Sequence, residues 1–194
     1  MSGGSILFAG VGGQGILLAS EITSYALMAA GFDLKKSEVH GMAQRGGSVT
    51  AQLRYGSKVY SPLIGAGEAD ILVAFELMES LRYMQMIGPG SRVIVNTQRI
   101  LPPSVATGQQ KYPEGVLETL NARGLSVFPV NAFDIAREIG ELRTANMVLV
   151  GALSSFVDVA PEYFIDVIDQ RVKKGFEKVN AEAFTRGRSL TGGI

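Results

Sequence analysis

The sequence has no cysteine and only one histidine. Without cysteine, the chain has no disulfide, no thiolate ligand for a metal and no cysteine nucleophile. Because cysteine thiolates hold most iron–sulfur clusters, any cluster that works with this chain must lie on a partner. Histidine and carboxylate residues are not spaced as in a metal site, and we predict none.

An excess of one charge is also missing, because 18 basic residues balance 18 acidic ones. A net charge of zero gives no overall attraction to nucleic acid or to an anionic membrane. The apolar stretch 147–153 is far shorter than the roughly 20 residues that cross a bilayer. Residues 1–4 lack the basic and apolar regions of a signal peptide. We therefore expect a cytoplasmic protein that binds neither nucleic acid nor membrane.

Length and composition, with 194 residues of which 46% are hydrophobic, fit one domain over residues 1–194. Strand-like apolar runs alternate with helical patterns, which predicts an α/β, Rossmann-like three-layer fold. We expect a mostly parallel sheet, an antiparallel hairpin and a C-terminal helical tail over about 161–194. The predicted strands are 6–9, 32–39, 48–54, 59–61, 71–75, 91–96 and 124–130, with 48–54 and 59–61 forming the hairpin. The predicted helices are 14–30, 76–86, 114–121, 132–139, 144–157, one from Pro161, and 173–188.

A glycine-rich turn follows the first predicted strand and opens the first predicted helix. Gly10, Gly12 and Gly15 match the pattern G-x-G-x-x-G, with Gly13 and Gln14 between them. In this pattern the backbone approaches a phosphate, and the N–H groups at the start of the helix face the anion. A turn with only a structural role is the alternative.

Glu38 is the acidic residue nearest to the place where a nicotinamide-binding fold holds the ribose. Such a residue normally follows the first glycine by about 20 positions, and Glu38 comes later. The spacing weakens the interpretation as a dinucleotide-binding enzyme.

The segment from His40 to Ser48 is too rich in glycine for a helix and too polar for a buried strand, so we expect a loop beyond the sheet edge. Arg45, Gly46 and Gly47 would present a cation and free N–H groups to an anionic ligand. A plain surface loop with a solvated arginine is an equal alternative.

An independent active site is not evident, because it needs a nucleophile, a base or a metal in a defined arrangement. A loop histidine bonded to backbone is favoured over His40 as a general base, and Ser61 lacks a G-x-S-x-G context. This inventory predicts no catalytic residue and favours an accessory subunit. The apolar segment 144–157 is interpreted as a core helix, with an intersubunit contact through its small residues as the alternative.

Four strings carry a resemblance to a known family: GVGGQG at 10–15, SEVHGMAQRGGS at 37–48, YSPLI at 60–64 and EAD at 68–70. They resemble the gamma subunit or domain of the 2-oxoacid:ferredoxin oxidoreductases, whose members act on pyruvate, ketoisovalerate or 2-oxoglutarate. The string at 37–48 is the specific part. It is most similar to the small beta subunit of the indolepyruvate:ferredoxin oxidoreductases.

The resemblance implies an accessory subunit of a complex that oxidatively decarboxylates a 2-oxoacid, reduces ferredoxin and forms an acyl-coenzyme A. It implies that other subunits hold thiamine diphosphate, magnesium and iron–sulfur clusters, and that coenzyme A contacts this chain. A homodimer of the isolated chain is compatible with it. Residues carried over to the coenzyme A or active-site side are Gly10, Gly12, Gly13, Gln14, Gly15, Arg45, Gly46 and Gly47, with Glu38, His40 and Ser48 as further candidates.

Two other classes of function stay open at this point. One is a free-standing nicotinamide- or flavin-binding oxidoreductase, which binding of NADH or flavin to the isolated chain would reveal. The other is a scaffold protein, which need not copurify with a larger partner that bears clusters.

Overall fold

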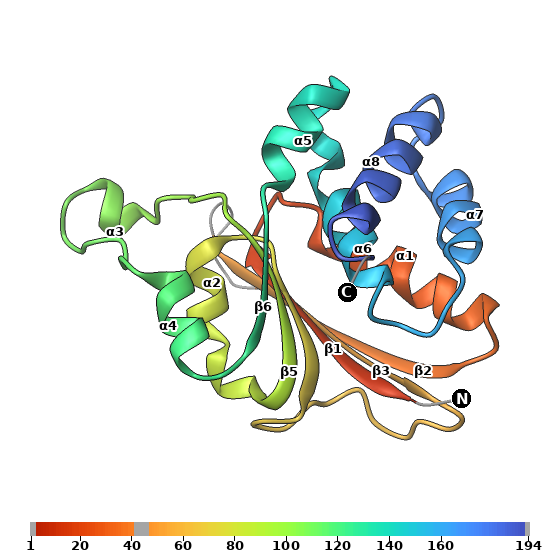
Figure 1. The fold of residues 1–194 in the computed structure, drawn as a ribbon, viewed down its shortest axis with the longest axis horizontal. Coiled ribbons are helices and arrows are strands. Elements are labelled where there is room, and N and C mark those ends of the chain that lie inside the picture. The colour runs from red at the N-terminus through yellow and green to blue at the C-terminus, as the bar shows by residue number, and fades with distance from the viewer. Residues whose placement is uncertain (1–2, 41–46, 193–194) are drawn as a thin grey trace.

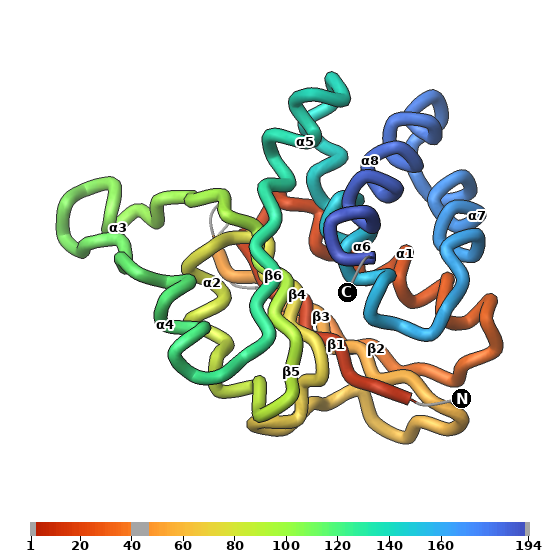
Figure 2. The backbone as a smooth tube through the Cα atoms, in the orientation of Figure 1, coloured from red at the N-terminus to blue at the C-terminus, as the bar shows by residue number. Residues whose placement is uncertain are grey.

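A six-stranded sheet lies between two layers of helices in the computed structural model, which describes residues 3–40 and 47–192 (Figure 1). The strand order is β2-β3-β1-β4-β5-β6, and in Figure 2 the strands can be followed from β2 toward β6. The strands are β1 (Gly4–Val11), β2 (Asp33–His40), β3 (Ser48–Gly56), β4 (Ala69–Ala74), β5 (Ile87–Asn96) and β6 (Ser126–Val130).

Helices cover both faces of the sheet. The α-helices are α1 (Ile16–Ala29), α2 (Leu77–Arg82), α3 (Pro103–Ala106), α4 (Val116–Ala122), α5 (Ala132–Ile139), α6 (Ala145–Ser154), α7 (Pro161–Arg171) and α8 (Glu177–Ser189). Two short 3₁₀ helices are η1 (Met84–Met86) and η2 (Leu142–Thr144). Figure 1 shows α1, α5, α6, α7 and α8 grouped on one side and α2 with α4 on the other. This arrangement confirms the predicted three-layer α/β fold.

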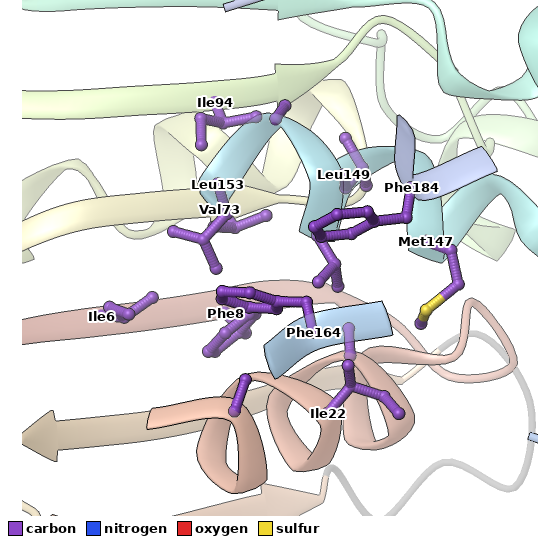
Figure 3. Packing of buried hydrophobic residues seen from close by; sticks show 14 of the residues in the cluster. Ile6, Phe8, Ile22, Val73, Ile94, Met147, Leu149, Leu153, Phe164 and Phe184 are labelled. Carbon is purple, nitrogen blue, oxygen red and sulfur yellow. The ribbon is translucent and has the colours of Figure 1, made fainter. Parts of the chain in front are cut away.

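Alternating side chains of the parallel strands form two hydrophobic cores. Ile6 and Phe8 of β1 point to the side of α1 and α6, while Leu7 and Ala9 point to the side of α2 and α4. In Figure 3 Phe8 packs among side chains from several elements of the larger core, including Phe164 of α7. Successive residues of a strand face opposite sides, so a central strand buried on both faces must be apolar throughout.

The predicted antiparallel pair is present as β2 with β3, but the predicted pairing of 48–54 with 59–61 is wrong. The residues of β3 pair antiparallel with β1 on one side and with β2 on the other. Residues 59–61 form no strand, because side chains accept the neighbouring N–H groups: Val59 N–H donates to Asp33 Oδ2 (2.9 Å) and Ile64 N–H donates to Gln52 Oε1 (2.7 Å). The Val59 hydrogen bond, more than the nearby lysines, lowers the pKa of the Asp33 carboxyl.

The buried helix predicted over 144–157 is α6, and its small residues serve a contact within the chain. A Cβ atom added to Gly151 would overlap the carbonyl oxygen of Phe184 in α8. A Cβ atom added to Gly187 of α8 would overlap the carbonyl oxygen of Val148 in α6. The two helix backbones therefore touch. The last helix is part of the core, and Thr191 beyond it donates to the Ala152 carbonyl (2.9 Å).

None of the helices in residues 3–40 and 47–192 has the length and apolarity that crossing a bilayer requires.

The contact between α6 and α8 predicts the effect of a single methyl group. Gly187→Ala should lower the free energy of unfolding by about 1–3 kcal/mol, because overpacking forces the helices apart. Helix propensity alone would instead raise it by up to about 1 kcal/mol, so the sign of the change is decisive. Urea unfolding measures it. In the control Gly56→Ala, the added Cβ would lie 3.6 Å from the Cα of Gly3, an ordinary contact, and should cost little. Equal midpoints for the two variants would contradict the contact.

Candidate functional site

A cleft of about 550 Å³ opens at the carboxyl ends of β1, β4 and β5. The glycine turn after β1 forms one wall, and a second wall comes from residues of η2 and α6: Leu142, Arg143, Ala145, Asn146 and Leu149. Phe75 and Asn96, from the ends of β4 and β5, line the cleft between them. Ligands of open α/β sheets bind at this edge, beyond the carboxyl ends of the strands.

The side chain of Gln14 closes the glycine turn. Its Oε1 accepts from the Val11 N–H (2.8 Å), and its Nε2 donates to the Phe75 carbonyl (2.8 Å). The Phe75 N–H donates in turn to the Ala9 carbonyl (2.8 Å). The amide of Gln14 thus joins the ends of β1 and β4, and its two polar atoms are engaged in holding the turn.

Each glycine of the turn meets a different constraint. A Cβ on Gly10 would lie 2.7 Å from the Cβ of Phe75. Gly15 has a φ of +75°, and a Cβ there would overlap the side-chain amide of Asn146. Gly13 has a φ of +97°, a conformation that side chains rarely adopt, with open space around it. Gly12 donates its N–H to the Gly47 carbonyl (3.0 Å).

The start of α1 is free to receive an anion. Gly15 is the N-cap residue and makes no side-chain cap, and the first turn contains no acidic residue. The first N–H groups of a helix lack partners inside the helix, and the helix dipole places partial positive charge there. Gly15 and Leu18 line the cleft, so this end of the helix adjoins it.

Arg143 is the cationic residue among the described residues that line the cleft. Its guanidinium pairs with Glu141 through Nε–Oε1 (2.9 Å) and Nη2–Oε2 (2.8 Å), and it lies 4.8 Å from the centre of the Phe176 ring. The hydrogen bonds from Arg143 lower the pKa of Glu141 to about 2. Because 71% of the Arg143 side chain is exposed, a ligand in the cleft can reach it.

The buried carboxylate of Glu76 holds the segment around Ile100, which lines the cleft. Glu76 is fully buried; one oxygen caps α2, accepting from the N–H groups of Met78 (2.8 Å) and Glu79 (3.2 Å). The other oxygen accepts from the Ile100 N–H (3.0 Å) and from the Tyr112 hydroxyl (2.5 Å). Burial and the bond to Glu76 raise the pKa of Tyr112 well above its ordinary value. Ile100, held in this way, lines the cleft.

The structure brings part of the predicted site together. Gly47 contacts the turn through its carbonyl, and Ser48 pairs with Val11 in the ladder between β3 and β1. Glu38 forms an ion pair with Lys36 (2.7 Å) in β2, and β3 lies between β2 and β1. A ribose carboxylate of a Rossmann fold lies instead on the strand next to the glycine turn.

Two predicted site residues, Arg45 and Gly46, lie outside the described residues. His40 is the last residue of β2 and pairs with Val49 in the ladder.

The sequence interpretation missed Asn146 and Arg143. Asn146 is buried, donates to the Gly15 carbonyl (3.3 Å) and accepts from the Met147 N–H (2.9 Å). One available signal was an asparagine at the start of an otherwise apolar helix. Arg143 carried no such signal, since only the tertiary fold brings it to the glycine turn.

The family model for pyruvate ferredoxin/flavodoxin oxidoreductase matches residues 5–190. The chain belongs to this family. It is 40% identical over 190 residues to the indolepyruvate oxidoreductase subunit IorB of Archaeoglobus fulgidus, covering 94% of this chain and 92% of that protein. The same subunit of Pyrococcus horikoshii is 37% identical over 191 residues, with 94% and 93% covered.

Solved structures share the fold. The gamma subunit of a keto/oxoacid ferredoxin oxidoreductase from Geobacter sulfurreducens has a TM-score of 0.73 at 22% identity, covering 98% of this chain and 99% of that one. A 2-oxoglutarate:ferredoxin oxidoreductase chain from Magnetococcus marinus has a TM-score of 0.79 at 23% identity, and this chain covers 32% of it. Together with the family, these relatives confirm the prediction of an accessory subunit of a 2-oxoacid:ferredoxin oxidoreductase complex.

The role of Gln14 predicts the effect of replacing its amide by a carboxylate. Gln14→Glu places an oxygen that cannot donate against the Phe75 carbonyl, so at neutral pH the free energy of unfolding should fall by about 1–3 kcal/mol. Denaturant unfolding of the purified chain measures the loss. Gln109→Glu, on an exposed position, is the control for the added charge. A loss no larger than that of the control would show that Gln14 does not hold the turn.

Proposed function

We propose that this chain binds coenzyme A in the cleft at the glycine turn and serves an indolepyruvate:ferredoxin oxidoreductase. The observation that carries the proposal is the uncapped start of α1, which opens onto a cleft that also presents Arg143. Phosphate groups bind at helix N-termini and to arginine, and coenzyme A carries several of them. The structure from Magnetococcus marinus, named as containing coenzyme A and succinyl-CoA, supports this choice of ligand.

The cleft suits the rest of the ligand as well. Leu18, Phe133 and Leu149 line it beside the polar groups. Cofactor sites combine apolar walls with a few polar groups that fix orientation. The apolar walls would contact the uncharged arm of coenzyme A, and the N–H groups of the turn would contact its phosphates.

The proposal keeps the residues that the family resemblance indicates. Gly12, Gly13 and Gly15 contribute backbone to the cleft, whereas Gln14 holds the turn. Gly10 belongs to the proposed set because it lets β1 approach Phe75, and Gly47 because it contacts Gly12. Arg45 and Gly46 are assigned to the set by the resemblance alone.

The chemistry is divided between subunits in this proposal. Partner subunits hold thiamine diphosphate, magnesium and iron–sulfur clusters, decarboxylate the 2-oxoacid and pass electrons to ferredoxin. This chain orients coenzyme A, which accepts the acyl group. The complex works in the cytoplasm. Indolepyruvate is preferred as substrate because identity is 40% to the indolepyruvate subunit but 29% to the 2-oxoglutarate synthase subunit KorC of Methanothermobacter marburgensis.

Replacing Arg143 tests the ligand. In the complex assembled with its partner subunits, Arg143→Ala should raise the KM for coenzyme A about tenfold, which corresponds to about 1.4 kcal/mol of lost binding. The KM for indolepyruvate should not change, since the 2-oxoacid binds elsewhere. Steady-state kinetics with each substrate varied in turn measures both constants.

Arg171→Ala is the matched control, because Arg171 also pairs with a carboxylate, Glu21 (3.3 Å), and stacks on an aromatic ring, Tyr25 (3.8 Å), but does not line the cleft. Arg45→Ala in the same assay decides whether that residue belongs to the site. An unchanged KM for coenzyme A in Arg143→Ala would remove the cleft from the proposal.

Glu141 competes with the ligand for Arg143. Because its pKa is lowered to about 2, the ion pair is intact above the ordinary carboxyl pKa and is lost only as the pH falls toward 2. Glu141→Gln should therefore lower the KM for coenzyme A by up to about threefold, because an exposed ion pair contributes only a small free energy. The effect should be the same at pH 6 and pH 8. A higher KM in the variant would show that Glu141 helps the ligand to bind.

A further inference from the structure

Glu79 is a buried carboxylate on α2 that does not line the cleft. Its side chain is 2% exposed. One oxygen accepts from the Ser48 hydroxyl (2.7 Å), and the other pairs with Arg82 Nε (2.9 Å). The Ser48 hydroxyl also lies 2.9 Å from the Tyr83 hydroxyl. Glu79 of α2 and Tyr83, the residue after α2, therefore hold Ser48, the first residue of β3.

Gly47, the residue before Ser48, is hydrogen-bonded to the glycine turn. The Gly47 carbonyl accepts the N–H of Gly12, in the middle of the glycine turn (3.0 Å). Ser48 is also the register partner of Val11, the last residue of β1. The dipeptide Gly47–Ser48 thus connects the glycine turn to α2, and a shift of either residue would move the other.

This carboxylate does not cap α2. Glu76, not Glu79, caps the helix, accepting from two of its first N–H groups. A buried carboxylate costs several kcal/mol of desolvation unless close partners offset it. The ion pair with Arg82 could form in solvent, because half of the Arg82 side chain is exposed. Burial of Glu79 is explained by its contact with Ser48.

We propose that Glu79 is a positioning residue: through Ser48 it fixes the Gly47 carbonyl, which orients the Gly12 N–H and with it the turn that faces the cleft. The consequence for coenzyme A rests on the proposed function of that turn. Glu79 itself does not contact the ligand.

The first test measures the turn directly. In the assembled complex, Glu79→Leu should make amide hydrogen exchange at Gly12 about tenfold faster, because its acceptor is no longer held in place. Ser48→Ala should have the same effect. Glu79→Gln, which keeps an acceptor oxygen for Ser48, and Ser48→Thr, which keeps the hydroxyl, should restore slow exchange.

Glu68→Gln is the control, because Glu68 also pairs with an arginine, Arg54 (3.1 Å), and does not line the cleft. The inference is overturned if amide hydrogen exchange at Gly12 is as slow in Glu79→Leu and Ser48→Ala as it is in this control.

The second test separates the inference from the proposed function. Glu79→Leu should raise the KM for coenzyme A about tenfold and leave kcat and the KM for the 2-oxoacid unchanged, and Glu79→Gln should reverse the rise. Faster exchange at Gly12 with an unchanged KM for coenzyme A supports the positioning role and overturns the coenzyme A site. A fall in kcat with both KM values and the exchange rate at Gly12 unchanged overturns the positioning role of Glu79.

Discussion

The main-chain carbonyl of Phe75 is the point on which the site depends. It accepts from the Gln14 side chain (2.8 Å) and from the Asn96 side chain (3.0 Å). Asn96 in turn accepts the Ala132 N–H at the start of α5 (3.3 Å). One oxygen at the end of β4 therefore sets the glycine turn after β1, the end of β5 and the entry to α5. Two donors satisfy a buried carbonyl fully, so the arrangement has little freedom.

Two buried carboxylates at the start of α2 extend this arrangement. Glu76 holds the segment around Ile100, and Glu79 holds Ser48 at the start of β3. Ser48 and Ile100 line the same small cavity beside α2, together with Val11 at the end of β1. Hydrogen bonds made by buried carboxylates thus hold two segments at this edge. Such bonds, together with packing, hold the residues of the edge in a defined geometry.

Local signals in the sequence predicted the local features. The glycine turn, the apolar strand before it and the helix 132–139, which is α5, follow from residues close together in the chain, and Asn131, which accepts from the Asp134 N–H, caps that helix. The place of β3 between β2 and β1 was not predictable, because strand pairing depends on contacts across the whole sheet and the periodicity of residues 48–54 fits either partner. The same holds for Asn146 and Arg143. The polarity of Asn146 in an apolar helix marked it as unusual but did not indicate its partner, Arg143 carried no signal, and only tertiary structure brings the two residues to the turn.

The contact between Gly15 and Asn146 joins residues 131 positions apart in the chain. Closing so long a loop is slow compared with forming a helix or a short turn, so this contact belongs to the late steps of folding. On the ribosome, the five strands through β5 are synthesised well before α6 emerges. A nascent chain can therefore pair these strands while the cleft still lacks the wall that η2 and α6 form.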